Sequence, residues 1–344
     1  MSIYKVLTVI TFSILLGACG GNSNASKNNF ELSTNHKDDH FKVGDTLKLN
    51  ISQGKNTEFE TVTYTLDSKS FTDNTVLKDL KLGAHTITAT INANSNTTEV
   101  SKVIYINSSV APKIYSFKII NVYPHDITSY TQGLEFHDGE LYESTGQYKE
   151  SKLRKVNFET GEVLKNIDLE DQYFGEGLTV LNDNLYQLTW KSNIGFVYDI
   201  NTFEKTRTFN YGNSKEGWGL CNDGSKLYKS DGTERIYTLN PENLAEGDYI
   251  EVYTNNGKIA SLNELEWING KIYANIYQRN GVAIVDPTTG AVDGVVDFSS
   301  LRKKVTQHPG LDVLNGIAYN PERNTIFVTG KHWDKLFEVE ISEK

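Results

Sequence analysis

Cysteine, methionine and proline are scarce in this 344-residue chain, which has two, one and six of them, whereas it has 19 tyrosines and 27 glycines. A composition rich in tyrosine and glycine favours twisted strands and tight turns over helices. Basic charge is also scarce, since 34 Lys and Arg face 44 Asp and Glu and the net charge is -10. This balance argues against a nucleic-acid partner, because a protein of that kind needs a basic stripe on its surface.

Long hydrophobic runs are absent after the first nineteen residues, and no later segment approaches the roughly 20 apolar residues of a membrane span. Those first residues, MSIYKVLTVITFSILLGAC, contain one lysine followed by an apolar run, which is typical of a secretory signal. The final LGAC resembles a bacterial lipoprotein box. The resemblance implies cleavage before Cys19 and acylation of its thiol, and the alternative is an ordinary signal peptide with a chance cysteine.

The residues after this box predict where the mature protein resides. Gly20 rather than an aspartate follows Cys19, which favours the outer membrane over retention in the inner one. The stretch GGNSNASKNN at 20–29 is too small and polar to bury a core, so it is interpreted as a tether. We expect a signal peptide at 1–18, a tether at 19–29, and a protein lipid-anchored in the bacterial cell envelope, at the outer membrane and facing the periplasm.

The sequence motifs of several reaction classes are also absent. It has no Gly-x-Ser-x-Gly, no phosphate-binding glycine loop, and no histidine pair spaced i, i+4 around a glutamate. With Cys19 taken by lipid, Cys221 has no partner, so the protein must be stable by packing alone and Cys221 is expected to be a small core residue. We predict neither a cofactor nor a catalytic metal, and a monomer, because nothing in the sequence indicates oligomerisation.

Residues 30–110 predict a small β-sandwich. Four segments of this region alternate apolar and polar residues with a period of two, and turn signals such as Gly-Asp and Asp-Ser separate them. Several short strands within about 80 residues are typical of an antiparallel sandwich of the immunoglobulin-like type. No cluster of potential metal ligands lies here, so we interpret the region as a spacer, with a binding role as the alternative. The stretch SSVAPKI at 108–114 is the expected linker.

Between residues 111 and 344 one sequence frame occurs five times. It begins as QGLEFHDGELYESTG at 132 and returns as EGLTVLNDNLYQLTW at 176, WGLCNDGSKLYKSDG at 218, NELEWINGKIYANIY at 263 and NGIAYNPERNTIFVTGK at 315. Each copy predicts a strand, an Asn/Asp/Gly turn, a second strand, a third and, in most copies, a fourth. A four-stranded unit repeated every roughly 40–50 residues is typical of a β-propeller, so we predict five blades. The last copy lacks its fourth strand, which the segment at 113–123 would supply, closing the ring.

Two positions of the frame differ from copy to copy, while the flanking Leu, Ile and Tyr recur. In a propeller the first strand of every blade lines the central channel, so equivalent residues converge on one axis. We therefore interpret the frame as scaffold and these two positions as the site. The first position holds Gln132, Glu176, Trp218, Asn263 and Asn315, and the second holds Gly146, Trp190, Gly232, Tyr277 and Lys331.

These positions bring a carboxylate, an ammonium group, three amides and aromatic walls to one pocket. Burial among aromatic rings should raise the pKa of Glu176, and a nearby Lys331 should oppose that shift. A carboxyl poised near neutral pH suits proton shuttling. Two alternatives remain: a propeller that binds a peptide or an envelope protein without chemistry, in which these residues only pack or form an ion pair, and a metal-dependent propeller hydrolase, which would need more acidic residues at the channel.

The motifs YTQGLEF, YFGEGLTVL, EGWGL, LNELEWINGKIYANIYQ and LNGIAYNPERNTIFVTGKHWDKLFEV resemble the plant and bacterial type of glutaminyl cyclase. The resemblance covers residues 115–344 and does not extend to 1–110. It implies a five-bladed propeller that acts on peptides or proteins with an N-terminal glutamine. The implied reaction converts this glutamine to pyroglutamate and releases ammonia.

The resemblance also implies roles for individual residues. Glu176 in FGEGLT matches the proton-shuttling carboxylate of the family, Lys331 in TGK matches its pocket lysine, and Asn263 in LNELEW matches a polar pocket residue, so we expect these three to be catalytic. Tyr130 stands where the family often has Phe, and Tyr277 stands where the plant enzymes have Trp, but both keep an aromatic face. The residues expected to bind substrate are Gln132, Trp190, Trp218, Tyr277, Phe174, Tyr130 and Asn315.

Overall fold

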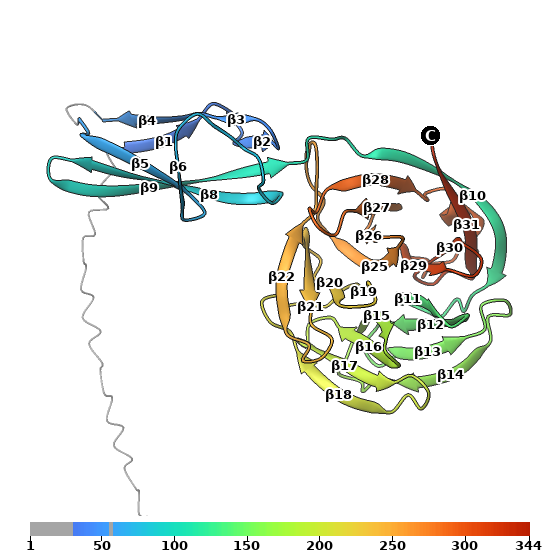
Figure 1. Ribbon diagram of the computed structural model, residues 1–344. Coiled ribbons are helices and arrows are strands. Elements are labelled where there is room, and N and C mark those ends of the chain that lie inside the picture. The colour runs from blue at the N-terminus through green and yellow to red at the C-terminus, as the bar shows by residue number, and fades with distance from the viewer. Residues whose placement is uncertain (1–29, 55–57) are drawn as a thin grey trace, which may run out of the picture.

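The structure is a computed structural model that describes residues 30–54 and 58–344 (Figure 1). The predicted signal peptide, tether and lipidated Cys19 all fall within 1–29 and lie outside the described residues. The described chain consists of strands and one short 3-10 helix, η1 (Leu301–Lys304), which confirms the predicted all-β class. Within these ranges no helix has the length and apolar character needed to cross a membrane.

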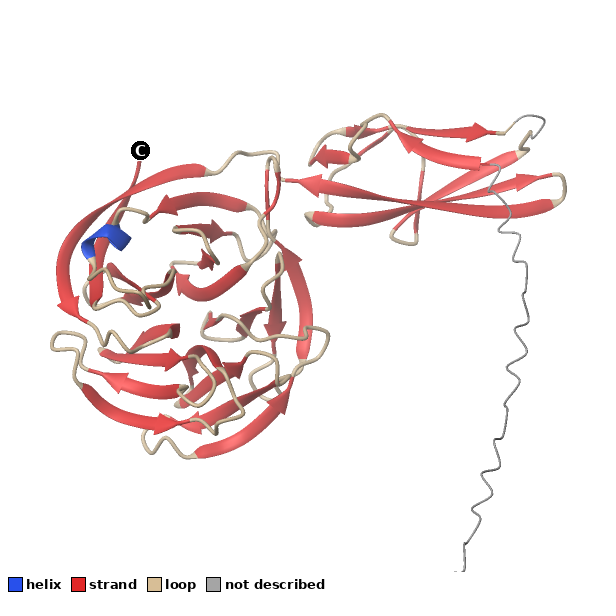
Figure 2. Ribbon diagram, turned by 180° about the vertical axis from the view of Figure 1, so that it is seen from behind, coloured by secondary structure: helices blue, strands red, loops and turns tan. Residues whose placement is uncertain are grey.

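The N-terminal part forms two layers of strands (Figures 1 and 2). One layer is a five-stranded sheet in the order β2-β9-β8-β5-β6, and the other contains the pairs β1–β4 and β3–β7. Buried and more exposed residues alternate along β8, as the period-two pattern predicted, and Phe41, Ile87 and Ile104 belong to the shared core. The strands are β1 (Phe30–Thr34), β2 (His40–Lys42), β3 (Thr46–Leu47), β4 (Leu49–Gln53), β5 (Thr61–Leu66), β6 (Lys69–Phe71), β7 (Thr75–Val76), β8 (Gly83–Ala93) and β9 (Asn96–Asn107).

The rest of the chain forms sheets that follow one another around a common axis (Figure 1). Three sheets are four-stranded, and one is eight-stranded in the order β25-β26-β27-β28-β10-β31-β30-β29. The first strand of each repeat lies innermost, and these inner strands contact one another in a closed circuit: β11 with β15, β15 with β19, β19 with β25, β25 with β29, and β29 with β11. The inner ends of all the sheets therefore meet at one axis.

The bounds of the strands match the repeating frame of the sequence. The three four-stranded sheets consist of β11 (Thr131–His137), β12 (Glu140–Thr145), β13 (Lys152–Val156) and β14 (Val163–Asp168); β15 (Gly175–Leu181), β16 (Asn184–Thr189), β17 (Ile194–Asp199) and β18 (Lys205–Asn210); and β19 (Leu220–Asn222), β20 (Leu227–Ser230), β21 (Arg235–Leu239) and β22 (Glu246–Glu251). A short hairpin follows, of β23 (Tyr253–Thr254) and β24 (Gly257–Lys258). The eight-stranded sheet consists of β10 (Lys113–Pro124), β25 (Leu262–Ile268), β26 (Lys271–Ile276), β27 (Gly281–Val285), β28 (Val292–Asp297), β29 (Leu314–Asn320), β30 (Thr325–Gly330) and β31 (Lys335–Glu343).

Strand β10 joins the two ends of this part of the chain. It pairs antiparallel with β31, from Tyr115 opposite Glu343 to Pro124 opposite Lys335. This confirms the pairing predicted for the segment at 113–123. The first residues of β10 also run parallel to β28, which links two neighbouring sheets into the eight-stranded one. The repeats did not predict this second contact, because it lies between units rather than within one.

A register shift marks the first variable position in four of the inner strands. The antiparallel pairing slips between Thr131 and Gly133 in β11, and β15, β25 and β29 slip at the corresponding place. Such β-bulges bend a strand and re-aim a side chain, and they are frequent beside active sites. The residues that lie at these bulges are Gln132, Glu176, Asn263 and Asn315.

Glycines after the variable position allow neighbouring inner strands to approach closely. A Cβ atom on Gly177 would lie 2.6 Å from the Leu220 nitrogen, and one on Gly219 would lie 2.0 Å from the Asn263 oxygen. A Cβ atom cannot come this close to a backbone nitrogen or oxygen, so only glycine fits at these two positions. Two residues after Gly219, Cys221 is fully buried, as expected for a core residue.

We expect Gly219→Ala to lower the free energy of unfolding by about 3 kcal/mol, the upper end of the range for overpacked positions. Gly281→Ala is the matched control, because its Cβ would meet nothing closer than the Val296 oxygen at 3.6 Å. Denaturant titration of both variants measures the difference. Equal stability of the two variants would contradict the close approach of β19 and β25.

The N-terminal part packs against the ring through contacts outside the connecting segment. The Glu251 carboxylate, at the end of β22, accepts hydrogen bonds from the Ala84 N–H at 2.8 Å and from Arg235 Nε at 3.1 Å. The ring of Tyr253 is buried in the core of the N-terminal part. The two parts therefore share buried surface.

Candidate active site

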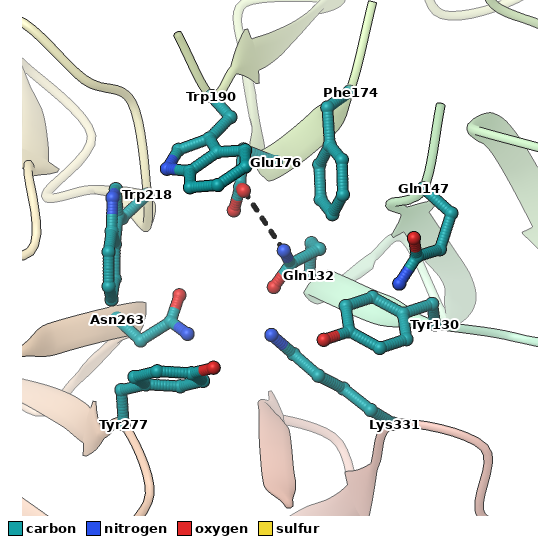
Figure 3. A pocket seen from close by; sticks show the side chains of 10 residues that line it. All are labelled: Tyr130, Gln132, Gln147, Phe174, Glu176, Trp190, Trp218, Asn263, Tyr277 and Lys331. Atoms are coloured by element: carbon teal, nitrogen blue, oxygen red, sulfur yellow. Dashed lines mark hydrogen bonds between the residues drawn. The ribbon is translucent and has the colours of Figure 1, made fainter. Parts of the chain in front are cut away.

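A cavity of about 220 Å³ lies among the beginnings of the inner strands (Figure 3). Three of its lining residues lie at the start of β11, β15 and β25, and three others directly follow β16, β26 and β30. Antiparallel pairing brings these two sets together, since the start of one strand faces the end of its neighbour. The lining residues are Tyr130, Gln132, Gln147, Phe174, Glu176, Trp190, Trp218, Asn263, Tyr277 and Lys331.

All residues predicted to be catalytic or to bind substrate, except Asn315, lie on this cavity. Asn315 is buried behind it, where its Nδ2 donates to the Thr131 carbonyl at 2.9 Å and to Gln132 Oε1 at 3.2 Å. Asn315 thus positions Gln132, and the expectation that it also binds substrate stays a prediction. The frame placed Asn315 on the inner strand correctly, but could not show that its neighbour covers it.

The lining also contains Gln147, which sequence reasoning missed. Gln147 follows Gly146, the residue that the repeating frame placed at the second variable position. Its backbone has a φ of 88°, so the chain turns sharply directly after the glycine. A polar residue next to an unusually small residue at a site position is the signal that could have identified it.

Glu176 is buried and accepts one hydrogen bond within the pocket, from Gln132 Nε2 to its Oε1 at 2.9 Å (Figure 3). Because Asn315 holds the oxygen of Gln132, the nitrogen of Gln132 is directed at Glu176. Burial raises the pKa of Glu176 well above its ordinary value, the charge of Lys331 opposes this, and the charge of Glu216 adds to it. The carboxyl therefore holds a proton more readily than an exposed glutamate does, which is a property that a proton-transfer group needs.

Lys331 presents its ammonium group to the same cavity. Its Nζ lies 4.5 Å from the centre of the Tyr130 ring and 5.3 Å from that of Tyr277, so two aromatic faces stabilise the charge. Burial lowers the pKa of Lys331, and the charges of Glu176 and Asp312 act in the opposite direction. Within 30–54 and 58–344, no side-chain or backbone oxygen accepts a hydrogen bond from this Nζ.

Asn263 also has an unused polar group at the cavity. Its Oδ1 is buried without a hydrogen-bond partner in the described part of the chain. Buried polar atoms are nearly always paired in proteins, so this unpaired oxygen beside the cavity is available to a bound molecule. The pocket thus presents the Lys331 ammonium, the Asn263 amide and the Glu176 carboxyl to one bound molecule.

Aromatic side chains form the walls around these groups. The Trp190 ring packs against Phe174 with centroids 5.4 Å apart, and Trp218 meets Tyr277 edge-on at 5.5 Å. The indole N–H groups of Trp190 and Trp218 both donate to Glu216 Oε2, each at 2.9 Å. Glu216 was not predicted as a site residue, although it opens the motif EGWGL.

A buried polar network supports the loops that carry Tyr130 and Lys331. The Glu143 carboxylate accepts hydrogen bonds from Thr131 Oγ1 at 2.8 Å and Ser129 Oγ at 3.2 Å, and His125 Nε2 lies 3.0 Å from it. Nδ1 of the same His125 lies 2.7 Å from the carbonyl oxygen of Trp333. One carboxylate therefore connects the segment before β11 to the loop after β30.

Three further carboxyl groups are buried deeper along the inner strands. Glu135, Glu264 and Glu266 each accept a backbone N–H from a neighbouring inner strand, and burial raises the pKa of all three, that of Glu135 to about 7. Their role is to join strands, and none lines the cavity. Across 30–54 and 58–344, no three His, Cys, Asp or Glu side chains are grouped so as to hold a metal ion.

The fold and the site together define an all-β protein whose aromatic pocket contains a buried carboxyl and a buried lysine. The family model described as glutamine cyclotransferase matches residues 85–341. A glutaminyl-peptide cyclotransferase of Arabidopsis thaliana is 38% identical over 234 residues, which are 67% of this chain and 73% of the relative. The chain belongs to the glutamine cyclotransferase family, which confirms the predicted resemblance.

A solved structure gives the same result. The glutaminyl cyclase of Myxococcus xanthus matches with a TM-score of 0.63 and 38% sequence identity, over 68% of this chain and 99% of that one. Nearly the whole of that protein therefore corresponds to part of this chain. The family match begins at residue 85, inside β8, so the prediction that the resemblance does not extend to 1–110 was wrong for residues 85–110.

Proposed function

We propose that this protein cyclises the N-terminal glutamine of peptides and proteins to pyroglutamate and releases ammonia. The observation that supports this best is that three polar groups meet on one small cavity: the Glu176 carboxyl, the Lys331 ammonium and the Asn263 amide. An N-terminal glutamine carries both reactants, an amine and a carboxamide. A pocket that folds its side chain back brings the amine to the carbonyl carbon, so that proximity supplies much of the rate enhancement.

In this reaction the α-amine nitrogen bonds to the side-chain carbonyl carbon, and the bond from that carbon to the amide nitrogen breaks. Glu176 accepts the proton that the amine loses and delivers it to the departing ammonia, so the protein returns to its starting state. Its raised pKa matches a group that must both take and give a proton. Gln132, held by Asn315, keeps the carboxyl oriented through its hydrogen bond.

The carbonyl oxygen gains negative charge when the amine attacks. Lys331 Nζ and Asn263 Nδ2 are the donors on the cavity that would receive this charge. The unpaired Asn263 Oδ1 would instead accept a hydrogen bond from an N–H of the substrate. The walls of Phe174, Trp190 and Trp218 exclude water, so hydrolysis does not compete with ring closure. Tyr277 and Tyr130 flank Lys331 and keep its ammonium group over the cavity.

Ammonia release from a short peptide with N-terminal glutamine tests this proposal, with a peptide of the same sequence and an acetylated N-terminus as the control. We expect ammonia and a product lighter by one ammonia from the free peptide only, because acetylation removes the nucleophile. We expect the same rate with EDTA, because no step uses a metal. No ammonia in either condition would favour a binding module, and loss of activity with EDTA would indicate a metal site.

We also propose that residues 111–344 form a five-bladed β-propeller. The support is the closed circuit of five inner strands and the four strands assigned to each unit, with β10 completing the unit of β29, β30 and β31. We assign residues 30–110 to a β-sandwich of the immunoglobulin-like type, on the basis of their two layers of strands. In this proposal it serves as a spacer.

The location of the protein is a proposal from the sequence alone. We propose that residues 1–18 are a lipoprotein signal peptide, that Cys19 carries the lipid, and that 19–29 are a tether to the outer membrane. Residues 111–344 then face the periplasm, and the protein is a monomer. Its partners there are peptides or proteins with an N-terminal glutamine. Labelling of Cys19 by a radioactive fatty acid, lost in Cys19→Ala, tests the anchor.

A further inference from the structure

Glu216 lies behind the pocket and joins two of its walls. Trp190 follows β16 and Trp218 precedes β19, so the two tryptophans belong to different sheets. Both indole N–H groups nevertheless donate to the same atom, Glu216 Oε2, at 2.9 Å each. In Figure 3 the two indole nitrogens point to the same side of the pocket. Glu216 itself does not line the cavity, so it acts on a bound substrate only through other residues.

Contacts with buried residues fix the backbone of Glu216. The fully buried Lys229 donates to the Glu216 carbonyl at 2.7 Å and forms an ion pair with Glu246 at 3.4 Å. The next residue, Gly217, donates its N–H to the Trp190 carbonyl at 3.1 Å, and a Cβ there would lie 2.4 Å from Tyr211 Oη. The buried Lys229 and the tightly packed Gly217 thus fix the backbone at Glu216. This fixed backbone keeps the Glu216 carboxylate beside the two indoles.

Glu216 is also the second negative charge beside Glu176. Lys331 faces Glu176 from the loop after β30, Gln132 donates to it from β11, and Tyr130 and Tyr211 lie within range of its charge. The positive charge of Lys331 favours the ionised form of Glu176, whereas the negative charge of Glu216 disfavours it. On the outer side, the exposed Lys191 lies 3.9 Å from the Glu216 carboxylate and neutralises it only in part.

We infer that Glu216 is a positioning residue of the cyclisation reaction, because one of its carboxylate oxygens fixes both the Trp190 and the Trp218 wall and its negative charge lies behind the pocket that contains Glu176. This rests on the proposed function. The two effects can be separated, because the hydrogen bonds need an acceptor oxygen and the electrostatic effect needs a charge. Glu216→Gln keeps the oxygen and removes the charge, whereas Glu216→Ala removes both.

The test measures kcat, KM and the pH dependence of kcat/KM for ammonia release from a glutamine peptide. In Glu216→Gln we expect KM within about threefold of the wild type, because the indoles keep their acceptor. The acid limb of kcat/KM should move to lower pH by about half a pH unit or more, because Glu176 ionises more readily without the neighbouring charge. In Glu216→Ala we expect the same displacement and, in addition, KM raised about tenfold, since two walls are released.

Glu204→Gln is the charge-matched control, because Glu204 is exposed at the far edge of the same sheet as Trp190. An acid limb that stays in place in Glu216→Gln, or that moves equally in Glu204→Gln, would overturn the electrostatic role. Wild-type KM in Glu216→Ala would overturn the role in fixing the walls. Near-UV circular dichroism of the tryptophans, altered in Glu216→Ala and unchanged in Glu216→Gln, gives a readout that does not depend on turnover. Inactive wild-type protein would instead contradict the proposed function.

Discussion

Glu176→Gln is expected to lower kcat for ammonia release by about 10²–10⁴-fold, the range associated with loss of a general acid–base group. The amide has nearly the shape of the carboxyl, so it still fits between Gln132 and the aromatic walls, but it cannot carry a proton between the amine and the leaving ammonia. Thermal unfolding of the variant should stay close to that of the wild type. Initial rates at saturating peptide, measured on the folded variant, check this expectation.

Glu135→Gln is the matched control for that substitution. Glu135 is a buried carboxyl on the same axis, but it lies outside the cavity and bonds to the Val180 N–H. Since burial already raises the pKa of Glu135 to about 7, replacing it by a neutral amide is a small change. Its activity should remain within a few-fold of the wild type, and a Glu176→Gln variant that keeps more than a few per cent of activity would contradict the role of Glu176.

The wild-type pH profile should be bell-shaped. Burial raises the pKa of Glu176 above the ordinary range of a carboxyl, so kcat/KM should fall as the pH drops through that raised value and Glu176 becomes protonated. Burial lowers the pKa of Lys331, so activity should also fall on the alkaline side at a pH below that of an exposed lysine. If kcat/KM did not fall until the pH reached the pKa of an exposed carboxyl, the buried environment described for Glu176 would be contradicted.

The second large effect is expected from Lys331→Met, which should lower kcat by about 10²–10³-fold. Methionine fills the space between the Tyr130 and Tyr277 rings but brings no charge to the carbonyl oxygen. The loss should appear mainly in kcat rather than KM, because the negative charge on that oxygen exists only after attack. Steady-state kinetics on the purified variant separates the two constants.

Lys335→Met is the control, because Lys335 is four residues further along the chain and bonds to the Lys304 carbonyl outside the pocket. It should retain wild-type kinetics. A Lys331→Met variant with unchanged kcat and raised KM would show that Lys331 binds the ground state and does not stabilise the transition state.

Most of the fold that could be predicted from the sequence followed from its repeating frame. The turn residues and the alternation predict most strands from β11 to β31, because local chemistry and register decide both. The hairpin of β23 and β24 was not predicted, and β19 begins only after Trp218. The pairing of β10 with β31 also followed from an unpaired edge in the last repeat. The parallel contact of β10 with β28 could not be predicted, since it depends on how neighbouring sheets meet.

The site was predictable where one residue occupies an equivalent position in each repeat. Glu176, Trp190, Asn263 and Lys331 reach the cavity because the bulges and strand ends recur. Asn315 obeyed the same frame and still lies behind Gln132, because side-chain packing rather than register decides which layer faces the cavity.

The supporting residues were harder to identify from the sequence. Glu216 and Gln147 lie one or two residues outside the frame, in loops whose conformation no repeat fixes. Glu143 and His125 act through contacts with segments far away in the sequence, such as the loop at Trp333. Residues that hold the site rather than form it are specified by tertiary packing, and a single sequence does not show that packing.

The most direct test of the account is the structure of Glu176→Gln with a glutamine peptide bound, because this variant should bind substrate without consuming it. We predict the glutamine side chain in the cavity, with its carbonyl oxygen within hydrogen-bond distance of Lys331 Nζ and the Asn263 amide, and the α-amine next to residue 176. A peptide bound outside the cavity, or one whose carbonyl oxygen faces away from Lys331 and Asn263, would contradict the mechanism.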